Sequence, residues 1–87
     1  MGKTVVRRIL MEEQMGFCAY CFNKMTMNVN RSNTCTRDHI TPRSQGGKSD
    51  RTNIVGVCST CNNEKSDTPL IIFLLRRSKR AKSSNPV

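Results

Sequence analysis

Two Cys-x-x-Cys pairs constrain this chain more than any other feature of its sequence. Cys18 and Cys21 form the first pair, Cys58 and Cys61 form the second, and 36 residues separate the two. A Cys-x-x-Cys turn places two sulfur atoms at adjacent corners of a tetrahedron, so two turns supply four thiolates for a closed, structural zinc site. The competing interpretation is redox chemistry or disulfides, but a redox Cys-x-x-Cys normally occurs singly within a larger α/β fold.

The size of the chain explains why it needs such a site. With 87 residues, no tryptophan and only four aromatic side chains, it is expected to form one small domain spanning residues 1–87, with a thin core. Domains of this size usually depend on disulfides or a metal. Cys35, the fifth cysteine, is predicted to be a small, buried or half-buried apolar side chain.

The charge of the chain favours a polyanionic partner. Fifteen Lys and Arg against six Asp and Glu give a formal net charge of +9, which four thiolates holding one Zn²⁺ would lower to about +7. Such a surface suits DNA or RNA, of which DNA is the favoured candidate. The alternative is a cationic surface that serves only solubility. A membrane partner is disfavoured, because no long stretch pairs a basic face with an aromatic-rich apolar one.

The first residues of the sequence are not expected to act as a targeting signal. Residues 1–14 lack a continuous apolar core and include acidic residues, unlike a signal peptide. Val6 stands where a myristoylation signal requires Ser or Thr. The longest apolar run, residues 70–75, is far shorter than a membrane span. The protein is therefore expected in the cytoplasm, where cysteines stay reduced and free to bind metal.

Local patterns predict an α+β arrangement. Residues 3–16 have the spacing of a short amphipathic helix that stops at Gly16. Residues 34–40 and 54–58 are rich in β-branched side chains and are predicted as two strands. The segment between them contains Pro42 and a Gly-Gly pair, which indicates a loop.

Two further helices are predicted near the C-terminus. A short one should begin near Thr60 or Cys61. The next should have Thr68 as its N-cap and Pro69 at its first position. It is apolar at first and then basic, and residues 81–87 are expected to fray.

The only histidine, His39, lies outside both cysteine pairs, in the sequence D-H-I-x-P-x-S-x-G-G. It is followed by Asn53, and then by Asn62 in N-I-V-x-x-C-x-x-C-N-x-x-K. This order of residues resembles the HNH endonuclease family, of the zinc-containing phage or mobile-element type, over about residues 16–67. The helix and tail at residues 69–87 lie outside the motif. A lone histidine is more often structural, but the adjacent Asp38 and the Gly-rich basic loop favour catalysis.

The resemblance implies a small ββα-metal domain that hydrolyses phosphodiester bonds in DNA. His39 would be the general base for the attacking water, since an ordinary imidazole titrates near pH ~6.5. Asp38 and Asn62 match the ligands of one catalytic divalent ion, and Asn53 matches the residue that holds the loop and orients His39. These four form the expected catalytic set. The resemblance to this family also suggests a phage-encoded protein in a bacterial host.

The ligand types indicate which ion is expected. Carboxylate and amide oxygens are hard ligands, which suit Mg²⁺ or Mn²⁺. Many family members have histidine in place of Asn62, and an amide binds most transition metals more weakly than imidazole. We therefore expect weak binding of the catalytic ion in the absence of DNA.

Basic residues around the loop are candidate phosphate contacts, or else a solvated surface. They are Arg37, Arg43, Lys48, Arg51 and Lys65. The basic segment 76–82 could grip flanking DNA or simply form a solvated helix end.

Two other interpretations remain open. The chain could be a non-catalytic, zinc-containing nucleic-acid-binding module, which explains the charge and the cysteines but not the spacing of the catalytic set. It could also be an inactive HNH-like scaffold that bridges proteins. The sequence identifies no protein partner and does not distinguish a monomer from a homodimer.

Overall fold

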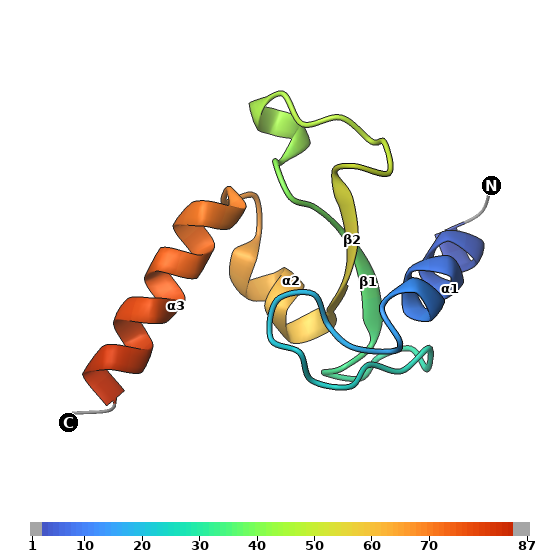
Figure 1. Ribbon diagram of the computed structural model, residues 1–87, viewed down its shortest axis with the longest axis horizontal. Coiled ribbons are helices and arrows are strands. Elements are labelled where there is room, and N and C mark those ends of the chain that lie inside the picture. The colour runs from blue at the N-terminus through green and yellow to red at the C-terminus, as the bar shows by residue number, and fades with distance from the viewer. Residues whose placement is uncertain (1–2, 85–87) are drawn as a thin grey trace.

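The structure, a computed structural model, describes residues 3–84, with the side chains of residues 4–78. It contains three α-helices, one short 3₁₀ helix and two strands among these residues (Figure 1). In chain order they are α1 (Lys3–Glu13), β1 (Cys35–His39), the 3₁₀ helix η1 (Arg43–Gln45), β2 (Ile54–Cys58), α2 (Ser59–Lys65) and α3 (Leu70–Ser84).

The two strands form an antiparallel hairpin with a long connection. Cys35 lies opposite Cys58 and His39 lies opposite Ile54. Residues 40–53 close the far end of the hairpin and include η1. With α2 following β2 directly, the arrangement is β-β-α, and the predicted α+β fold class is confirmed.

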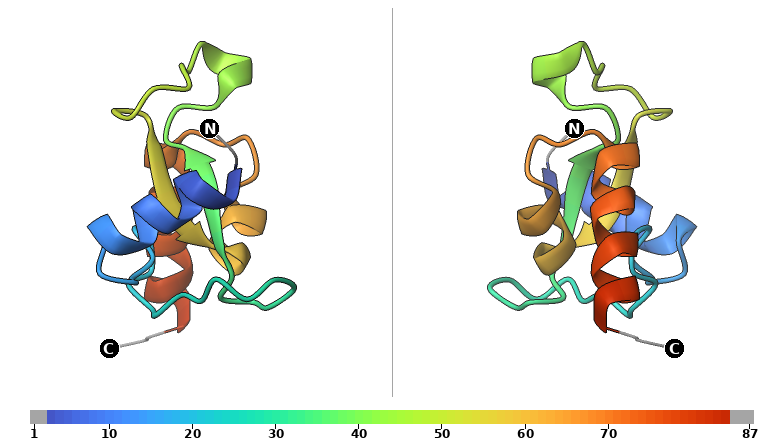
Figure 2. Two further views of the ribbon diagram at one scale, coloured as in Figure 1. Left: turned by 90° about the vertical axis from the view of Figure 1, so that its right-hand side faces the viewer. Right: turned by 90° about the vertical axis from the view of Figure 1, so that its left-hand side faces the viewer.

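Helix α1 covers one side of the hairpin, as both views in Figure 2 show. Its Leu10 is buried and approaches β2 closely at Gly56, where an added Cβ would lie 3.2 Å from the Leu10 Cβ. The helix ends at Glu13, and Gly16 follows at a φ of 82° that favours glycine, so the predicted stop is confirmed. The predicted apolar side of this helix is only partly buried against the hairpin, since Val5 on it is 47% exposed.

Helices α2 and α3 lie on the other side of the hairpin (Figure 2). Between them and the strands is a small core in which Tyr20 and Phe73 meet with ring centroids 5.5 Å apart. Cys35 and Val57 are completely buried within the same cluster. The predicted burial of Cys35 is thereby confirmed.

The helix boundaries differ slightly from the predictions. Helix α2 begins at Ser59, slightly before the predicted start. Helix α3 begins at Leu70, one residue after the predicted start at Pro69. The Pro69 carbonyl accepts the first helical hydrogen bond, from the Phe73 amide at 3.0 Å, so Pro69 takes the N-cap position that was predicted for Thr68. The predicted fraying from residue 81 is wrong as far as Ser84, since residues 81–84 contain no Gly or Pro to stop the helix; residues 85–87 lie outside the described range.

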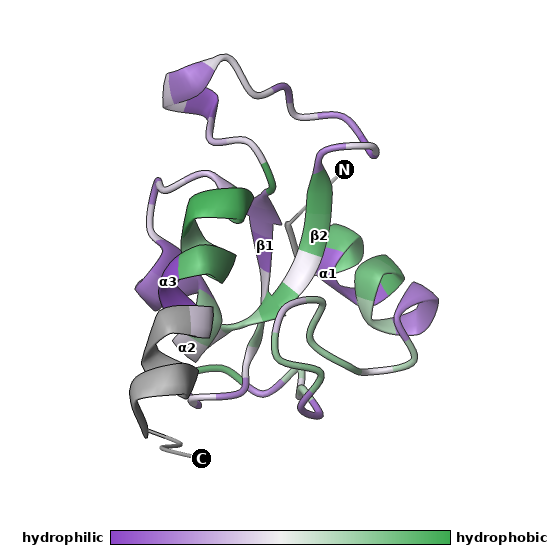
Figure 3. Cartoon of the chain, turned by 60° about the vertical axis from the view of Figure 1, so that its left-hand side comes forward, coloured by the Kyte–Doolittle hydropathy of each residue, from purple (hydrophilic) through white to green (hydrophobic). Residues whose placement is uncertain are grey.

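The start of α3 is strongly apolar (Figure 3), and Ile71 and Leu75 within its first two turns are mostly exposed. Among residues 3–84 no helix combines the length and the apolar character that crossing a membrane requires.

Candidate functional site: a four-cysteine cluster and an adjacent polar cleft

The two Cys-x-x-Cys pairs meet in one cluster, which we call the four-cysteine cluster. The ligand atoms of Cys18, Cys21, Cys58 and Cys61 all lie within 4.8 Å of one another, and no disulfide joins them. The Cys21 and Cys58 sulfurs are 3.8 Å apart, which equals the spacing of about 3.8 Å in a tetrahedron with Zn–S bonds of about 2.3 Å. The donor set and its spacing therefore fit one tetrahedral zinc ion.

Hydrogen bonds around the cluster prepare it to hold thiolates. Burial alone would raise the pKa of the Cys18 thiol, but amide groups of Cys21, Cys58 and Tyr20 donate to its sulfur and bring the pKa to about 7. Burial raises the pKa of Cys58 and of Cys61. A bound cation would oppose that effect, because thiolates are the form that coordinates metal.

Arg77 links α3 to this cluster. Its Nη2 donates to the Cys61 sulfur at 3.3 Å and to Glu64 at 3.1 Å, and its guanidinium lies 4.5 Å from the centroid of the Phe73 ring. Arg77, one residue of the basic segment 76–82, therefore binds groups within the domain itself. Side chains from residue 79 onward lie outside the described ones, so the role of the rest stays a prediction.

A polar cleft of about 620 Å³ lies beside the cluster, between β1, η1 and α2. We call it the His39 cleft. It brings together three members of the predicted catalytic set, namely Asp38, His39 and Asn62. Asn53 does not line it.

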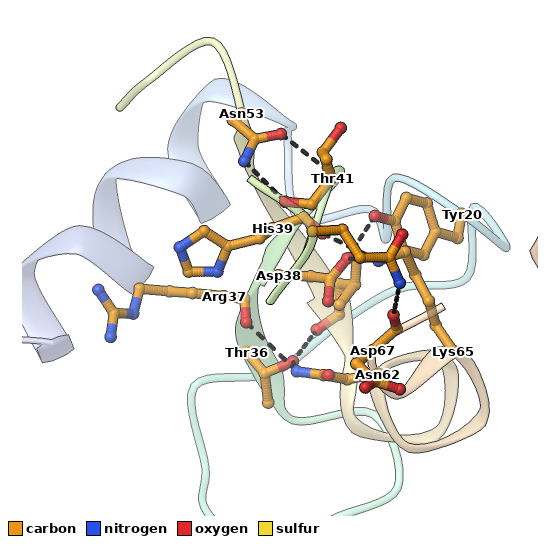
Figure 4. Close-up of polar contacts among 12 residues, drawn as sticks. Tyr20, Thr36, Arg37, Asp38, His39, Thr41, Asn53, Asn62, Lys65 and Asp67 are labelled. Carbon is orange, nitrogen blue, oxygen red and sulfur yellow. Dashed lines mark hydrogen bonds and ion pairs between the residues drawn. The ribbon is translucent and has the colours of Figure 1, made fainter. Parts of the chain in front are cut away.

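The carboxylate of Asp38 is buried and firmly held (Figure 4). Its Oδ2 accepts a hydrogen bond from the Tyr20 hydroxyl at 2.5 Å and pairs with the Lys65 ammonium at 3.0 Å. Both partners use the same oxygen, so Oδ1 has no partner among the described residues. Burial, then the hydrogen bond to Asp38, raise the pKa of Tyr20, which keeps this phenol protonated as a donor.

Lys65 corrects one prediction. It was expected to contact phosphate, but its side chain is completely buried, and its ammonium binds Asp38 and the carbonyl oxygen of His39 at 2.9 Å. The prediction of a surface contact is wrong, because a buried ammonium requires internal acceptors and has found two of them. Lys65 instead fixes the backbone and the carboxylate next to His39.

Asn62 is oriented by β1. Its Nδ2 donates to Thr36 Oγ1 at 2.8 Å and to the Arg37 carbonyl at 3.3 Å (Figure 4). Its amide oxygen accepts no hydrogen bond within the described part of the chain. The cleft thus offers two hard oxygen atoms, one from Asn62 and one from Asp38, a donor set that fits Mg²⁺ or Mn²⁺.

His39 is the half-buried last residue of β1. Figure 4 shows its ring extending away from the Asp38 carboxylate, as alternation along a strand requires. Its Nε2 lies 3.0 Å from the Ser49 hydroxyl. One ring nitrogen is therefore engaged by the loop, and Nδ1 has no bond to a described residue.

Asn53 holds the loop that carries these contacts. Its Oδ1 accepts from the Thr41 amide at 2.9 Å, and its Nδ2 donates to the carbonyls of Thr41 at 3.0 Å and Lys48 at 2.8 Å. These bonds tie together the two ends of the segment containing η1. This geometry is compatible with the predicted loop-holding role, while any effect of Asn53 on His39 stays a prediction.

The remaining basic candidates are dispersed. Arg37 and Arg43 line the His39 cleft. Lys48 belongs to the loop itself and lines a separate depression. Arg51 pairs with Glu13 of α1 at the surface. Of the five basic candidates, only Arg37 and Arg43 line the His39 cleft. Phosphate contact by Arg37, Arg43, Lys48 and Arg51 stays a prediction.

Sequence reasoning missed several residues of this site. Tyr20, Ser49, Asn63 and Asp67 were not predicted, although the first binds Asp38, the second binds His39 and the other two line the cleft. Tyr20 could have been found, because it lies between Cys18 and Cys21 of the four-cysteine cluster and so must approach that cluster. No sequence pattern pointed to the other three.

Comparison with known proteins gives the class of this fold and site. A family model described as HNH endonuclease matches residues 18–68, more than half of the chain. The chain belongs to the HNH endonuclease family, as its resemblance predicted.

Its relatives are large CRISPR enzymes. The CRISPR-associated endonuclease Cas9 of Corynebacterium diphtheriae is 40% identical over 57 residues, which is 64% of this chain and 5% of that protein. Cas9 of Actinomyces naeslundii is 36% identical over 70 residues, which is 79% of this chain and 6% of that protein. The crystal structure of the type II-C Cas9 from A. naeslundii superposes with a TM-score of 0.73 and 33% identity, covering 86% of this chain and 7% of the other. The chain thus spans only about 5–7% of the length of these relatives.

Replacing Lys65 by methionine should strongly destabilise the domain. Breaking a buried ion pair leaves an uncompensated charge, which typically costs about 3–5 kcal/mol, and Asp38 would be left with Tyr20 as its only side-chain partner. Urea unfolding of zinc-loaded protein measures the change, with Lys48→Met as the control because Lys48 is exposed. Equal midpoints for the two variants would show that the buried pair contributes nothing to stability.

Proposed function

We propose that this chain is a metal-dependent DNA endonuclease domain that hydrolyses phosphodiester bonds in the His39 cleft. The observation that carries the proposal is the convergence of a histidine, a buried carboxylate and an oriented amide in one open cleft, within a domain of the HNH endonuclease family. The strongly basic composition, with a formal net charge of +9, suits a DNA substrate.

One zinc ion in the four-cysteine cluster would have a structural role. Four thiolates leave no open coordination position, so the cluster serves to pin the turn at residues 18–21 to the junction of β2 and α2. That junction carries Asn62, one residue after Cys61. Holding the cluster together therefore also holds one wall of the cleft.

Asp38 Oδ1 and Asn62 Oδ1 would hold one Mg²⁺ or Mn²⁺ ion. When bound, this ion would supply electrostatic stabilisation to the negative charge that develops on the phosphate and on the leaving 3′ oxygen. The Lys65 ammonium already neutralises part of the Asp38 charge. Together with the neutral amide of Asn62, this supports weak cation binding in the free protein.

His39 would act as the general base. Donation from Nε2 to the Ser49 hydroxyl would place the ring proton on Nε2 and leave Nδ1 unprotonated, able to take a proton from the attacking water. The Lys65 bond to the His39 carbonyl fixes the backbone at this position. These residues bind, orient and move a proton, while Arg37 and Arg43 would position the phosphate backbone.

The alternative function is a non-catalytic, zinc-containing nucleic-acid-binding module. It accounts for the cluster and for the charge. It gives no reason for Asp38 and Asn62 each to leave one hard oxygen free beside a histidine.

The test is plasmid cleavage measured against Mn²⁺ concentration for the wild type and two neighbouring asparagine variants. Asn62→Ala should raise the Mn²⁺ concentration for half-maximal cleavage by at least about tenfold, because a metal contact is lost. Asn63→Ala is the matched control, since Asn63 lines the same cleft but has no proposed ligand role, and it should cleave like the wild type.

Two results would contradict the proposal in different ways. An intact plasmid with wild-type protein under both Mg²⁺ and Mn²⁺ would exclude the nuclease function. Equal shifts in the two asparagine variants would exclude Asn62 as a ligand and leave the nuclease function standing.

A further inference from the structure

A second cleft, which we call the Arg31 cleft, adjoins the first. It has a volume of about 450 Å³ and is lined by Arg7, Arg31 and Arg37 together with the hydroxyl-bearing residues Thr34 and Ser59. No acidic side chain lines it. Three arginines around one hollow make it a strongly basic surface feature outside the residues assigned to catalysis.

None of these three arginines is neutralised within the part of the chain that the structure describes. The ion pairs formed there by other arginines join Arg51 to Glu13 and Arg77 to Glu64. Gathering three unpaired positive charges is unfavourable, and a bound anion would relieve the repulsion.

Arg7 is held in place by its own hydrogen bonds. Its Nε donates to the Cys35 carbonyl at 2.7 Å and its Nη2 donates to the Met27 carbonyl at 3.2 Å. Carbonyl oxygens fix the direction of the guanidinium but do not cancel its charge. Arg31, by contrast, is exposed, and its side chain has no hydrogen bond to a described residue. One arginine is thus oriented in advance and another is available to close on a ligand.

Arg37 connects the two clefts. It lines both of them, and it precedes His39 by two positions on β1. Residues two apart on a strand project to the same side at a spacing of about 6.6 Å. Figure 4 shows the Arg37 and His39 side chains extending together in this way. A continuous line of basic side chains therefore leads from His39 through Arg37 to Arg31 and Arg7.

We propose that the Arg31 cleft binds a backbone phosphate of the same DNA strand whose scissile phosphate lies in the His39 cleft. This inference rests on the proposed function and adds the direction in which the strand leaves the site. Arginine suits the task, because its planar fork makes two parallel hydrogen bonds to phosphate oxygens. Such a contact fixes the register of the strand without reading bases.

Salt-dependent binding tests the proposal. A fluorescent duplex is titrated with zinc-loaded protein at several salt concentrations, without Mg²⁺ or Mn²⁺ so that the DNA stays intact. Arg31→Gln should weaken binding about 5-fold at low salt and reduce the slope of log K against log salt by about 0.9. The Arg31→Gln/Arg37→Gln double variant should reduce the slope about twice as much. Arg8→Gln is the matched control, since Arg8 is exposed on α1 and lines neither cleft.

A second arm asks whether the phosphate belongs to the cleaved strand. Once Mn²⁺-dependent cleavage has mapped the cut, phosphates of that strand are replaced one at a time by neutral methylphosphonate. At one position near the cut, the replacement should weaken wild-type binding about as much as Arg31→Gln does, and should have no further effect on the Arg31→Gln protein.

The outcomes separate this inference from the function on which it rests. A wild-type slope in Arg31→Gln, or an equal loss in Arg8→Gln, would overturn the Arg31 cleft while wild-type cleavage continued to support the nuclease. Binding that depends on Arg31 without cleavage under any divalent ion would overturn the proposed function, and with it the claim about the scissile strand.

Discussion

His39→Ala is expected to lower the rate of single-turnover DNA cleavage by about 10²- to 10⁴-fold, the usual contribution of a general base. Alanine removes the imidazole that would take the proton from water. The sequence contains one histidine, so no second imidazole can replace it. Zinc content and DNA affinity should be unchanged, because the ring of His39 hydrogen-bonds to Ser49 of the loop and His39 is not a member of the four-cysteine cluster. The reaction is followed with a labelled duplex at saturating Mn²⁺.

A second variant separates the chemistry from a general disturbance of the cleft. Ser44 lines the same cleft, and its side chain has no hydrogen bond to a described residue. Ser44→Ala should therefore cleave at the wild-type rate. If His39→Ala kept wild-type activity, or if the two variants lost activity to the same extent, the assignment of His39 as the base would be wrong.

Cys61→Ser is expected to abolish the cooperative fold. Zinc bound by such clusters contributes folding free energy directly, about 10–16 kcal/mol in small zinc domains near pH 7. This contribution equals or exceeds the total free energy of unfolding of most small domains. Cys61 is 2% exposed and also receives the hydrogen bond from Arg77. Its loss would therefore release α3 as well as the metal.

Circular dichroism, thermal unfolding and the zinc content of purified protein measure this effect. Cys35→Ala is the matched control, because Cys35 is equally buried but lies outside the four-cysteine cluster. It should keep one zinc per chain and a cooperative transition. Retention of a sharp transition and a full complement of zinc in Cys61→Ser would contradict the structural role of the cluster.

The main elements of this fold follow from local sequence signals. β-Branched side chains predicted β1 and β2, and the cysteine spacing predicted the cluster that joins residues 18–21 to the start of α2. The end of α3 was not predicted, because residues 81–87 were expected to fray as a chain terminus, whereas the helix continues to Ser84. Charged residues with good helix propensity continue a helix when no Gly or Pro interrupts it.

The candidate site was predictable where the chemistry imposes a spacing. Asp38, His39 and Asn62 converge on one cleft because β1 pairs with β2, which leads directly into α2, and because Asn62 donates to Thr36 and to the Arg37 carbonyl of β1. Lys65 was assigned to the surface because charge alone does not reveal burial. Its position four residues after the buried Cys61, on the same face of α2, was the signal that could have corrected this.

Arg51 illustrates what sequence reasoning could not supply. It lies close to the loop in the sequence, yet it pairs with Glu13 of a helix 38 residues away. Only the packing of α1 against the hairpin brings these two residues together. Partners of surface charges depend on such tertiary contacts, which no local pattern records.

The most direct test of the central claim is a plasmid-cleavage assay with wild-type protein shown to carry one zinc per chain. The account predicts that supercoiled DNA is converted to nicked or linear form only after Mg²⁺ or Mn²⁺ is added. Plasmid that is bound by the protein yet stays intact with every divalent ion tried would contradict the account, and would favour a non-catalytic nucleic-acid-binding module.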